Sequence, residues 1–175
     1  SYFISNPLSY SVYPSSVRVA VPVDMIESTE YYVVDTIDFA DISSSINTFN
    51  IDVNQINSTL KITDESVSKF TVKIDASEMV SRTIIVPFSN LILNNTRDDY
   101  TVSINQDKNI SVKIIGDEAY INSISADNLT LMIDTTEQEI NEKITTMSGN
   151  VRIIGDFPCW AVGRYDVRVK ITPLN

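Results

Sequence analysis

The same pattern of alternating apolar and polar residues occurs twice in this chain. Three segments of the first half return in the same order in the second half: residues 17–21, 32–38 and 70–74 correspond to residues 110–114, 129–134 and 165–171. The two copies lie about 95 residues apart, which is too long for a solenoid repeat and suits two small tandem domains. This internal repeat therefore predicts a duplicated architecture.

A short stretch without alternation separates the two copies. Residues 76–82 lie between two strongly patterned segments and contain neither Gly nor Pro. A connection of this length and composition is expected to be short and fairly stiff. We therefore predict one domain over residues 1–78 and a second over residues 79–175, in an elongated arrangement.

The periodicity of the apolar residues predicts a mainly β fold. Apolar residues make up 43% of the chain and recur with period two far more than with the helical period. Short strands separated by Asn, Asp, Ser and Pro are typical of antiparallel sheets. Strands are expected at 17–21, 32–38, 48–53, 59–63, 70–75, 83–88, 100–104, 110–115, 129–133, 151–154 and 165–171.

Few helices are expected. Thr136 and Glu139 resemble a capping box, and Ile140, Ile144 and Met147 then fall on one helical face. This pattern predicts a helix over residues 136–147 that ends before Gly149, although a β-hairpin arm fits the same spacing. Short helical turns are also expected at residues 40–44 and 118–123.

Composition argues against most kinds of enzyme. The chain has no His and one Cys, Cys159, so His-based triads and the usual zinc sites are excluded. Four glycines leave no loop that cradles phosphate, and a net charge of -10 disfavours nucleic acid as a partner. We therefore expect a non-catalytic protein without metal or cofactor, in which Cys159 packs in the core.

Two acidic arrangements keep a chemical interpretation open. Glu118 and Asp134 could act as a carboxylate pair, and Asp35, Asp38 and Asp41 recur at a spacing of three. The alternative is that these carboxylates bond local backbone where strands end. We favour the second interpretation for both.

Three aromatic residues are candidates for partner binding. Tyr31, Phe157 and Trp160 are of the types that anchor protein interfaces. For Trp160, packing in a core or between domains is the stronger interpretation, with a partner surface as the alternative.

The aligned segments resemble the YbbR-like domain. In the second copy the resemblance rests on segments 83–87, 109–117, 121–124, 131–134 and 163–169, and in the first copy on 14–19, 37–38 and 70–74. The first copy departs from the pattern at Pro22 or Asp24, where the family has a Gly turn, and in the weak first strand near residues 8–12.

The resemblance implies a module on the extracytoplasmic face of a bacterial membrane, behind an anchoring helix that is absent from this chain. It also implies a protein partner, with a membrane-bound diadenylate cyclase as the best understood example, and no catalytic residues. An alternative is a structural or adhesive surface module that acts as a spacer or binds carbohydrate. No stretch approaches the roughly 20 apolar residues of a membrane helix, so a soluble fragment is expected.

Overall fold

The computed structural model describes residues 8–26, 32–56, 61–94, 98–135 and 143–174. Within these ranges the protein is mainly β, with mostly antiparallel sheets and few short helices, which confirms the predicted fold class. No helix in the described ranges has the length and apolar character that crossing a bilayer requires.

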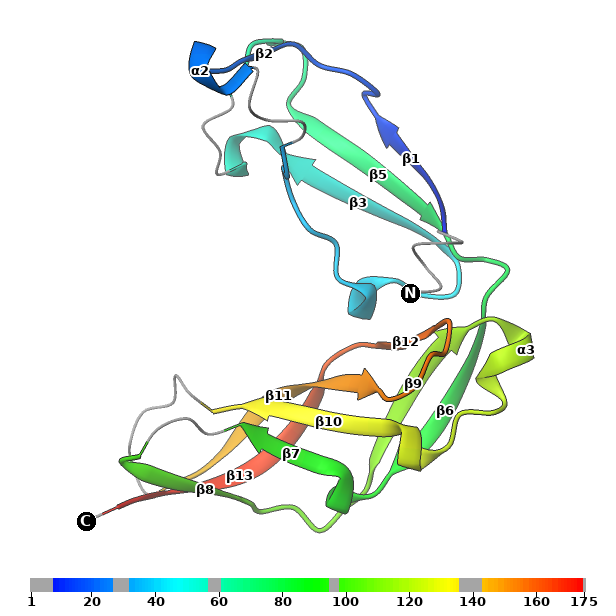
Figure 1. Cartoon of the computed structure of the whole chain (residues 1–175), viewed down its shortest axis with the longest axis vertical. Helices are drawn as coiled ribbons and strands as arrows, with labels where there is room; N and C mark the ends of the chain where they lie inside the picture. Colours follow the sequence, from blue (N-terminus) through cyan, green and yellow to red (C-terminus); the bar gives the residue numbers. More distant parts are fainter. Residues whose placement is uncertain (1–7, 27–31, 57–60, 95–97, 136–142, 175) are drawn as a thin grey trace.

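The N-terminal half contains two small sheets (Figure 1). Its elements are β1 (Ser9–Tyr13), β2 (Val19–Ala20), α2 (Val23–Ile26), η1 (Phe39–Asp41), β3 (Ile46–Asp52), η2 (Val53–Gln55), β4 (Lys61–Ile62) and β5 (Lys69–Asp75). The central strand β5 pairs antiparallel with β1 and with β3, and β2 pairs with β4.

The C-terminal half contains a five-stranded and a three-stranded sheet. Its elements are β6 (Val80–Val86), η3 (Phe88–Asn90), β7 (Leu91–Asn94), β8 (Tyr100–Ile104), β9 (Ile110–Gly116), α3 (Glu118–Ile121), η4 (Ala126–Asn128), β10 (Leu129–Asp134), β11 (Lys143–Ile153), β12 (Cys159–Val162) and β13 (Tyr165–Pro173). The sheet orders are β7-β10-β11-β13-β8 and β12-β9-β6, and only the β7–β10 pair is parallel among the strands described.

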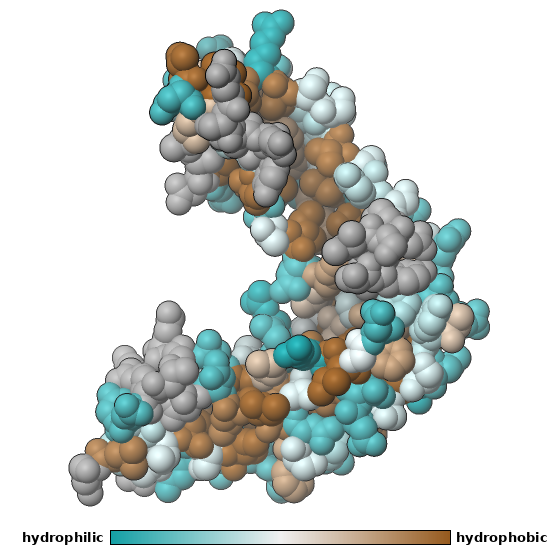
Figure 2. All heavy atoms as spheres, viewed as in Figure 1, coloured by the Kyte–Doolittle hydropathy of each residue, from teal (hydrophilic) through white to brown (hydrophobic). Residues whose placement is uncertain are grey.

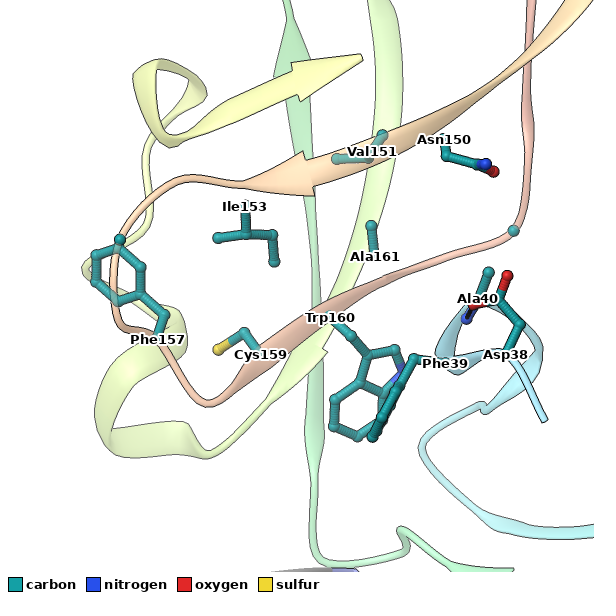
Figure 3. Close-up of a pocket in the computed structure, with 12 residues that line it drawn as sticks. Asp38, Phe39, Ala40, Asn150, Val151, Ile153, Phe157, Cys159, Trp160 and Ala161 are labelled. Carbon is teal, nitrogen blue, oxygen red and sulfur yellow. Dashed lines mark hydrogen bonds between the residues drawn. The ribbon is translucent and has the colours of Figure 1, made fainter. Parts of the chain in front are cut away.

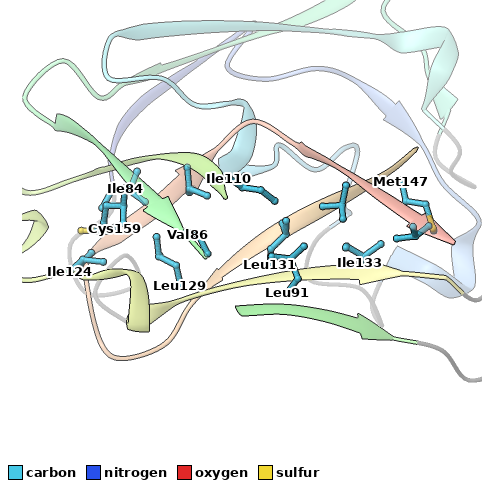
Figure 4. Packing of buried hydrophobic residues seen from close by; sticks show 14 of the residues in the cluster. Ile84, Val86, Leu91, Ile110, Ile124, Leu129, Leu131, Ile133, Met147 and Cys159 are labelled. Carbon is cyan, nitrogen blue, oxygen red and sulfur yellow. The ribbon is translucent and has the colours of Figure 1, made fainter. Parts of the chain in front are cut away.

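The main core lies in the C-terminal half. Alternate residues of β9 and β13 point inward, and Val112, Ile114, Val167, Val169 and Ile171 are fully buried. Figure 4 shows further members of this cluster from the neighbouring strands, gathered in the space between them. Each such side chain stabilises the fold by about 1.5–3 kcal/mol relative to its exposed state.

The N-terminal half has a much smaller core. Among the residues described before position 79, the buried apolar side chains are Ile42, Phe70 and Ala76. The Asp75 carboxylate accepts hydrogen bonds from the Ser77 N–H (2.9 Å) and hydroxyl (2.6 Å) just after β5 ends. The next strand, β6, begins at Val80, so the connection is shorter than the 76–82 stretch. The division at 78/79 stays a prediction.

The strand predicted at residues 32–38 is wrong. This segment has no regular structure, although its sequence alternates like that of β10. The Asp35 carboxylate accepts from the Thr36 N–H at 2.7 Å, and the Asp38 carboxylate accepts from the Ala40 N–H at 2.9 Å. Local bonds of this kind compete with a strand ladder. The structural repeat is therefore less complete than the repeat in the sequence.

The helix predicted over residues 136–147 is wrong where the structure describes it. Residues 136–142 lie outside the described ranges, and Lys143 begins β11, a strand of 11 residues. β11 pairs with both β10 and β13, so pairing distant in sequence outweighs the local helical spacing. Gly149 does not end a helix. It lies within β11, where an added Cβ would meet Leu131 Cδ1 at 2.9 Å.

Three short strands escaped the prediction from periodicity: β1, β7 and β12. The two expected helical turns occur in shifted or shortened form, as η1 and α3. Asp38 and Asp117 cap them by accepting hydrogen bonds from the backbone N–H groups of Ala40 and Ala119.

Candidate functional site

The two halves meet where η1 lies against β12 (Figure 1). The Trp160 indole N–H donates a hydrogen bond of 2.8 Å to the Ile42 carbonyl. The Phe39 and Trp160 rings lie 5.5 Å apart between centroids and are inclined by 57°. A backbone bond of 2.8 Å from the Gly163 N–H to the Ala40 carbonyl completes the contact. Hydrogen bonds and an aromatic contact thus join the two halves at the same place.

An apolar cluster surrounds this contact, and we call it the junction cluster. Its buried members are Ile42, Ala76, Ile115 and Trp160, and partly buried side chains from both halves pack around them. Ile114 faces the main core, whereas Ile115, the next residue of β9, belongs to the junction cluster. Strand β9 is therefore buried on both faces near its end because the N-terminal half covers its outer side.

A pocket of about 390 Å³ opens beside this cluster, and we call it the junction pocket (Figure 3). Asp38 and Phe39 line it from the N-terminal half, and Ile153, Phe157 and Trp160 line it from the C-terminal half. Figure 3 shows the Phe39 ring beside the Trp160 indole, with Phe157 farther along the wall. The side of the molecule seen in Figure 2 is hollowed between the halves.

Asp38 and Cys159 are the titratable residues among those that line the junction pocket. The Asp38 carboxylate is used as the cap of η1. Burial raises the pKa of the Cys159 thiol to about 11, and the negative charge of Asp117 adds to the increase. The thiol is therefore protonated and weakly nucleophilic at neutral pH. Within the described part of the chain, no group of three His, Cys, Asp or Glu side chains could hold a metal ion.

The structure brings together two of the three aromatic residues proposed as partner contacts. Phe157 and Trp160 both line the junction pocket. Trp160 is 5% exposed, so it mainly joins the halves and offers little surface to a partner. Tyr31 lies outside the described residues.

The carboxylates considered for catalysis do not share a site. Glu118 is in the first turn of α3, and Asp134 is the last residue of β10. Figure 1 shows these two places at opposite sides of the C-terminal half. The calcium interpretation of Asp35, Asp38 and Asp41 finds no support in the geometry, because Asp35 and Asp38 bond adjacent backbone N–H groups.

Two contributors to the site were missed in the sequence. Phe39, which is 40% exposed, supplies an aromatic ring. Ile42 supplies the carbonyl oxygen that accepts the hydrogen bond from the Trp160 indole. Gly155 was noticeable as one of four glycines, and its φ of +116° allows the turn. A Cβ there would lie 2.4 Å from the Phe157 ring, so the glycine also makes room for Phe157.

No family model matches the chain, and no curated protein matches it. Among solved structures, the chain is similar to the crystal structure of the YbbR-like domain of the lmo2119 protein from Listeria monocytogenes. The alignment has 16% sequence identity and a TM-score of 0.41, and it covers 55% of this chain and 96% of that chain. This neighbour is of the family whose motifs the sequence resembles.

Proposed function

We propose that this chain is a non-catalytic β module that acts by protein–protein contact on the extracytoplasmic side of a bacterial membrane. The observation that carries the proposal is the junction pocket, where aromatic rings from both halves meet. Aromatic side chains in such pockets are frequent anchors of protein interfaces. The membrane-side location and the partner class come from the resemblance stated above.

The partner proposed from that resemblance is a membrane-bound diadenylate cyclase. The contact would use the rim of the junction pocket, with Phe39 as the most exposed aromatic ring in it. Because η1 and β12 contribute to the same rim, a partner bound there would contact both halves at once. Binding of the cyclase would therefore depend on how the two halves are positioned relative to one another.

Immobilised chain offers a direct test against detergent-solubilised bacterial membranes that contain a diadenylate cyclase. The retained cyclase is measured as cyclic di-AMP formed from ATP. We expect retention by the native chain and at least about fivefold less by Phe39→Ala, because loss of an interface anchor commonly costs more than 1 kcal/mol.

Phe88→Ala is the matched control. Phe88 is also the first residue of a three-residue helix, η3, and is 50% exposed, but it does not line the junction pocket. The control should retain the cyclase like the native chain. Equal loss in both variants, or no membrane protein retained by any of them, would contradict the proposal. Retention on cell-wall polysaccharide alone would point instead to a structural or adhesive surface module.

A further inference from the structure

A second cavity, of about 420 Å³, lies in the N-terminal half, and we call it the apolar cavity. Ile51, Phe70 and Val72 line it from the β1-β5-β3 sheet, and Val34 and Ile37 line it from the irregular segment that was predicted as a strand. Its volume is within the range of about 300–1,000 Å³ typical of small-molecule sites.

The cavity follows from the single-layered build of this half. In the C-terminal half, two sheets share the core between them. The N-terminal sheet is covered on this face by single chain segments, and of the residues that line the cavity only Phe70 is buried. Unfilled apolar volume destabilises a fold in proportion to its size. An apolar occupant would therefore stabilise this half.

Tyr32 indicates which functional group a ligand in this cavity should carry. Tyr32 lines the same cavity, and its hydroxyl oxygen is buried and has no hydrogen-bond partner among the residues that the structure describes. Leaving a buried hydroxyl unbonded is unfavourable, so an occupant that offers an acceptor would be preferred. The cavity thus combines a mainly apolar wall with a lining residue that carries a buried hydroxyl donor.

The negative charge of the protein argues against a negatively charged ligand. Asp35 borders the cavity, and the chain as a whole carries a net charge of -10. Negative charge on the protein disfavours an anionic occupant such as a fatty-acid carboxylate. An uncharged carbonyl oxygen can accept from the Tyr32 hydroxyl without this repulsion.

We propose that the apolar cavity binds uncharged acyl esters, with the Tyr32 hydroxyl donating a hydrogen bond to the ester carbonyl and the acyl chain lying along β5. The ligand is either a free ester or an acyl chain of an uncharged or zwitterionic lipid. This proposal is independent of partner binding at the junction pocket.

The test uses the full chain and the uncharged fluorescent probe Nile red. The native protein should bind the probe, and methyl octanoate should displace it far better than octanoate of the same chain length. Displacement by phosphatidylcholine vesicles would identify a lipid as the source, and displacement by the free ester alone would identify a soluble ligand.

Three variants assign the site. Tyr32→Phe should weaken displacement by methyl octanoate about fivefold, as expected for one lost hydrogen bond. Val72→Phe should fill the cavity and abolish probe binding, and Val12→Phe serves the same purpose from the edge strand β1 if Val72→Phe fails to fold by circular dichroism. Tyr13→Phe is the matched control, because Tyr13 is 78% exposed and does not line the cavity.

The proposal is overturned by any of three results. Nile red could fail to bind the native chain, octanoate could displace the probe as well as its methyl ester does, or the folded cavity-filling variants could bind the probe like the native protein. Equal behaviour of Tyr32→Phe and Tyr13→Phe would remove Tyr32 from the site.

Discussion

Cys159 is held as a neutral thiol by the close packing of its surroundings. It is 7% exposed, and a Cβ on the facing Gly116 would lie 2.2 Å from its Sγ. Glycine at position 116 is therefore what lets β9 and β12 approach at this pair, Cys159 opposite Gly116. The residue that sequence analysis assigned to core packing is indeed part of the main core.

Stability should fall at alkaline pH because of this thiol. Its pKa is raised by burial, and further by Asp117, from about 9 to about 11. The unfolded chain therefore loses the proton first, and the contribution to folding is present below pH 9 and lost as the pH rises through 11. Urea unfolding at pH 8 and at pH 10.5 measures the effect.

Cys159→Ala is the control for that experiment, since it keeps the titrating Tyr and Lys side chains. Its urea midpoint should fall less between the two pH values than that of the native chain. The native thiol should also stay unreactive toward a disulfide reagent at pH 8 and react once the chain unfolds. Rapid modification of the folded protein would contradict the assignment.

The element that most departs from its local sequence is β11. Gly149 allows β10 and β11 to approach, because an added Cβ would lie 2.9 Å from Leu131 Cδ1 and 3.0 Å from the Met132 carbonyl oxygen. We expect Gly149→Val to lower the free energy of unfolding by about 2 kcal/mol, as overpacking typically does. Urea denaturation checks this. Thr146→Val, at an exposed position of the same strand, should change stability by less than about 0.5 kcal/mol.

Strands that alternate cleanly and lie against the main core could be predicted from sequence. β8, β9 and β13 are examples, because one buried face imposes period two on them. β1 has no such signal, since all five of its residues are exposed and no inward face marks it, and only the family resemblance placed a weak strand near residues 8–12. Residues 32–38 alternate without pairing, and the carboxylates of Asp35 and Asp38 instead accept hydrogen bonds from the backbone N–H groups of Thr36 and Ala40.

The candidate site, like the fold, could be predicted only in part from the sequence. Trp160 could be singled out by residue type, but its acceptor, the Ile42 carbonyl, lies 118 residues away in the chain. No periodicity reports a contact between a side chain and a backbone atom over that distance. Of the residues that line the junction pocket, the sequence therefore pointed to Phe157 and Trp160 as partner contacts and left the contribution of η1 unpredicted.

At the scale of the whole molecule, the junction cluster stabilises the N-terminal half, whose own core is small. We expect Trp160→Ala to remove both the indole hydrogen bond and the packing against Phe39, which are joint contacts of the two halves. Hydrogen exchange in β1, β3 and β5 should then become at least tenfold faster, while β10 and β13 change little.

Mass spectrometry of hydrogen exchange resolves these strands separately. Trp160→Phe keeps an aromatic ring but no donor, and it should give an intermediate effect. Uniform acceleration across both halves in Trp160→Ala would mean that they unfold as one unit. In that case the junction would be an ordinary part of a single core.

The pairing at the base of the N-terminal sheet has a mechanical consequence. Ser9 at the start of β1 faces Asp75 at the end of β5, and Leu8 packs in the junction cluster. Tension between Leu8 and the C-terminal strand β13 would pull these two adjacent strand ends apart. Because antiparallel hydrogen bonds run perpendicular to the strands, the load would fall on one bonded pair at a time. The hydrogen-bonded pairs between β1 and β5 would therefore separate one after another, starting from Ser9 and Asp75.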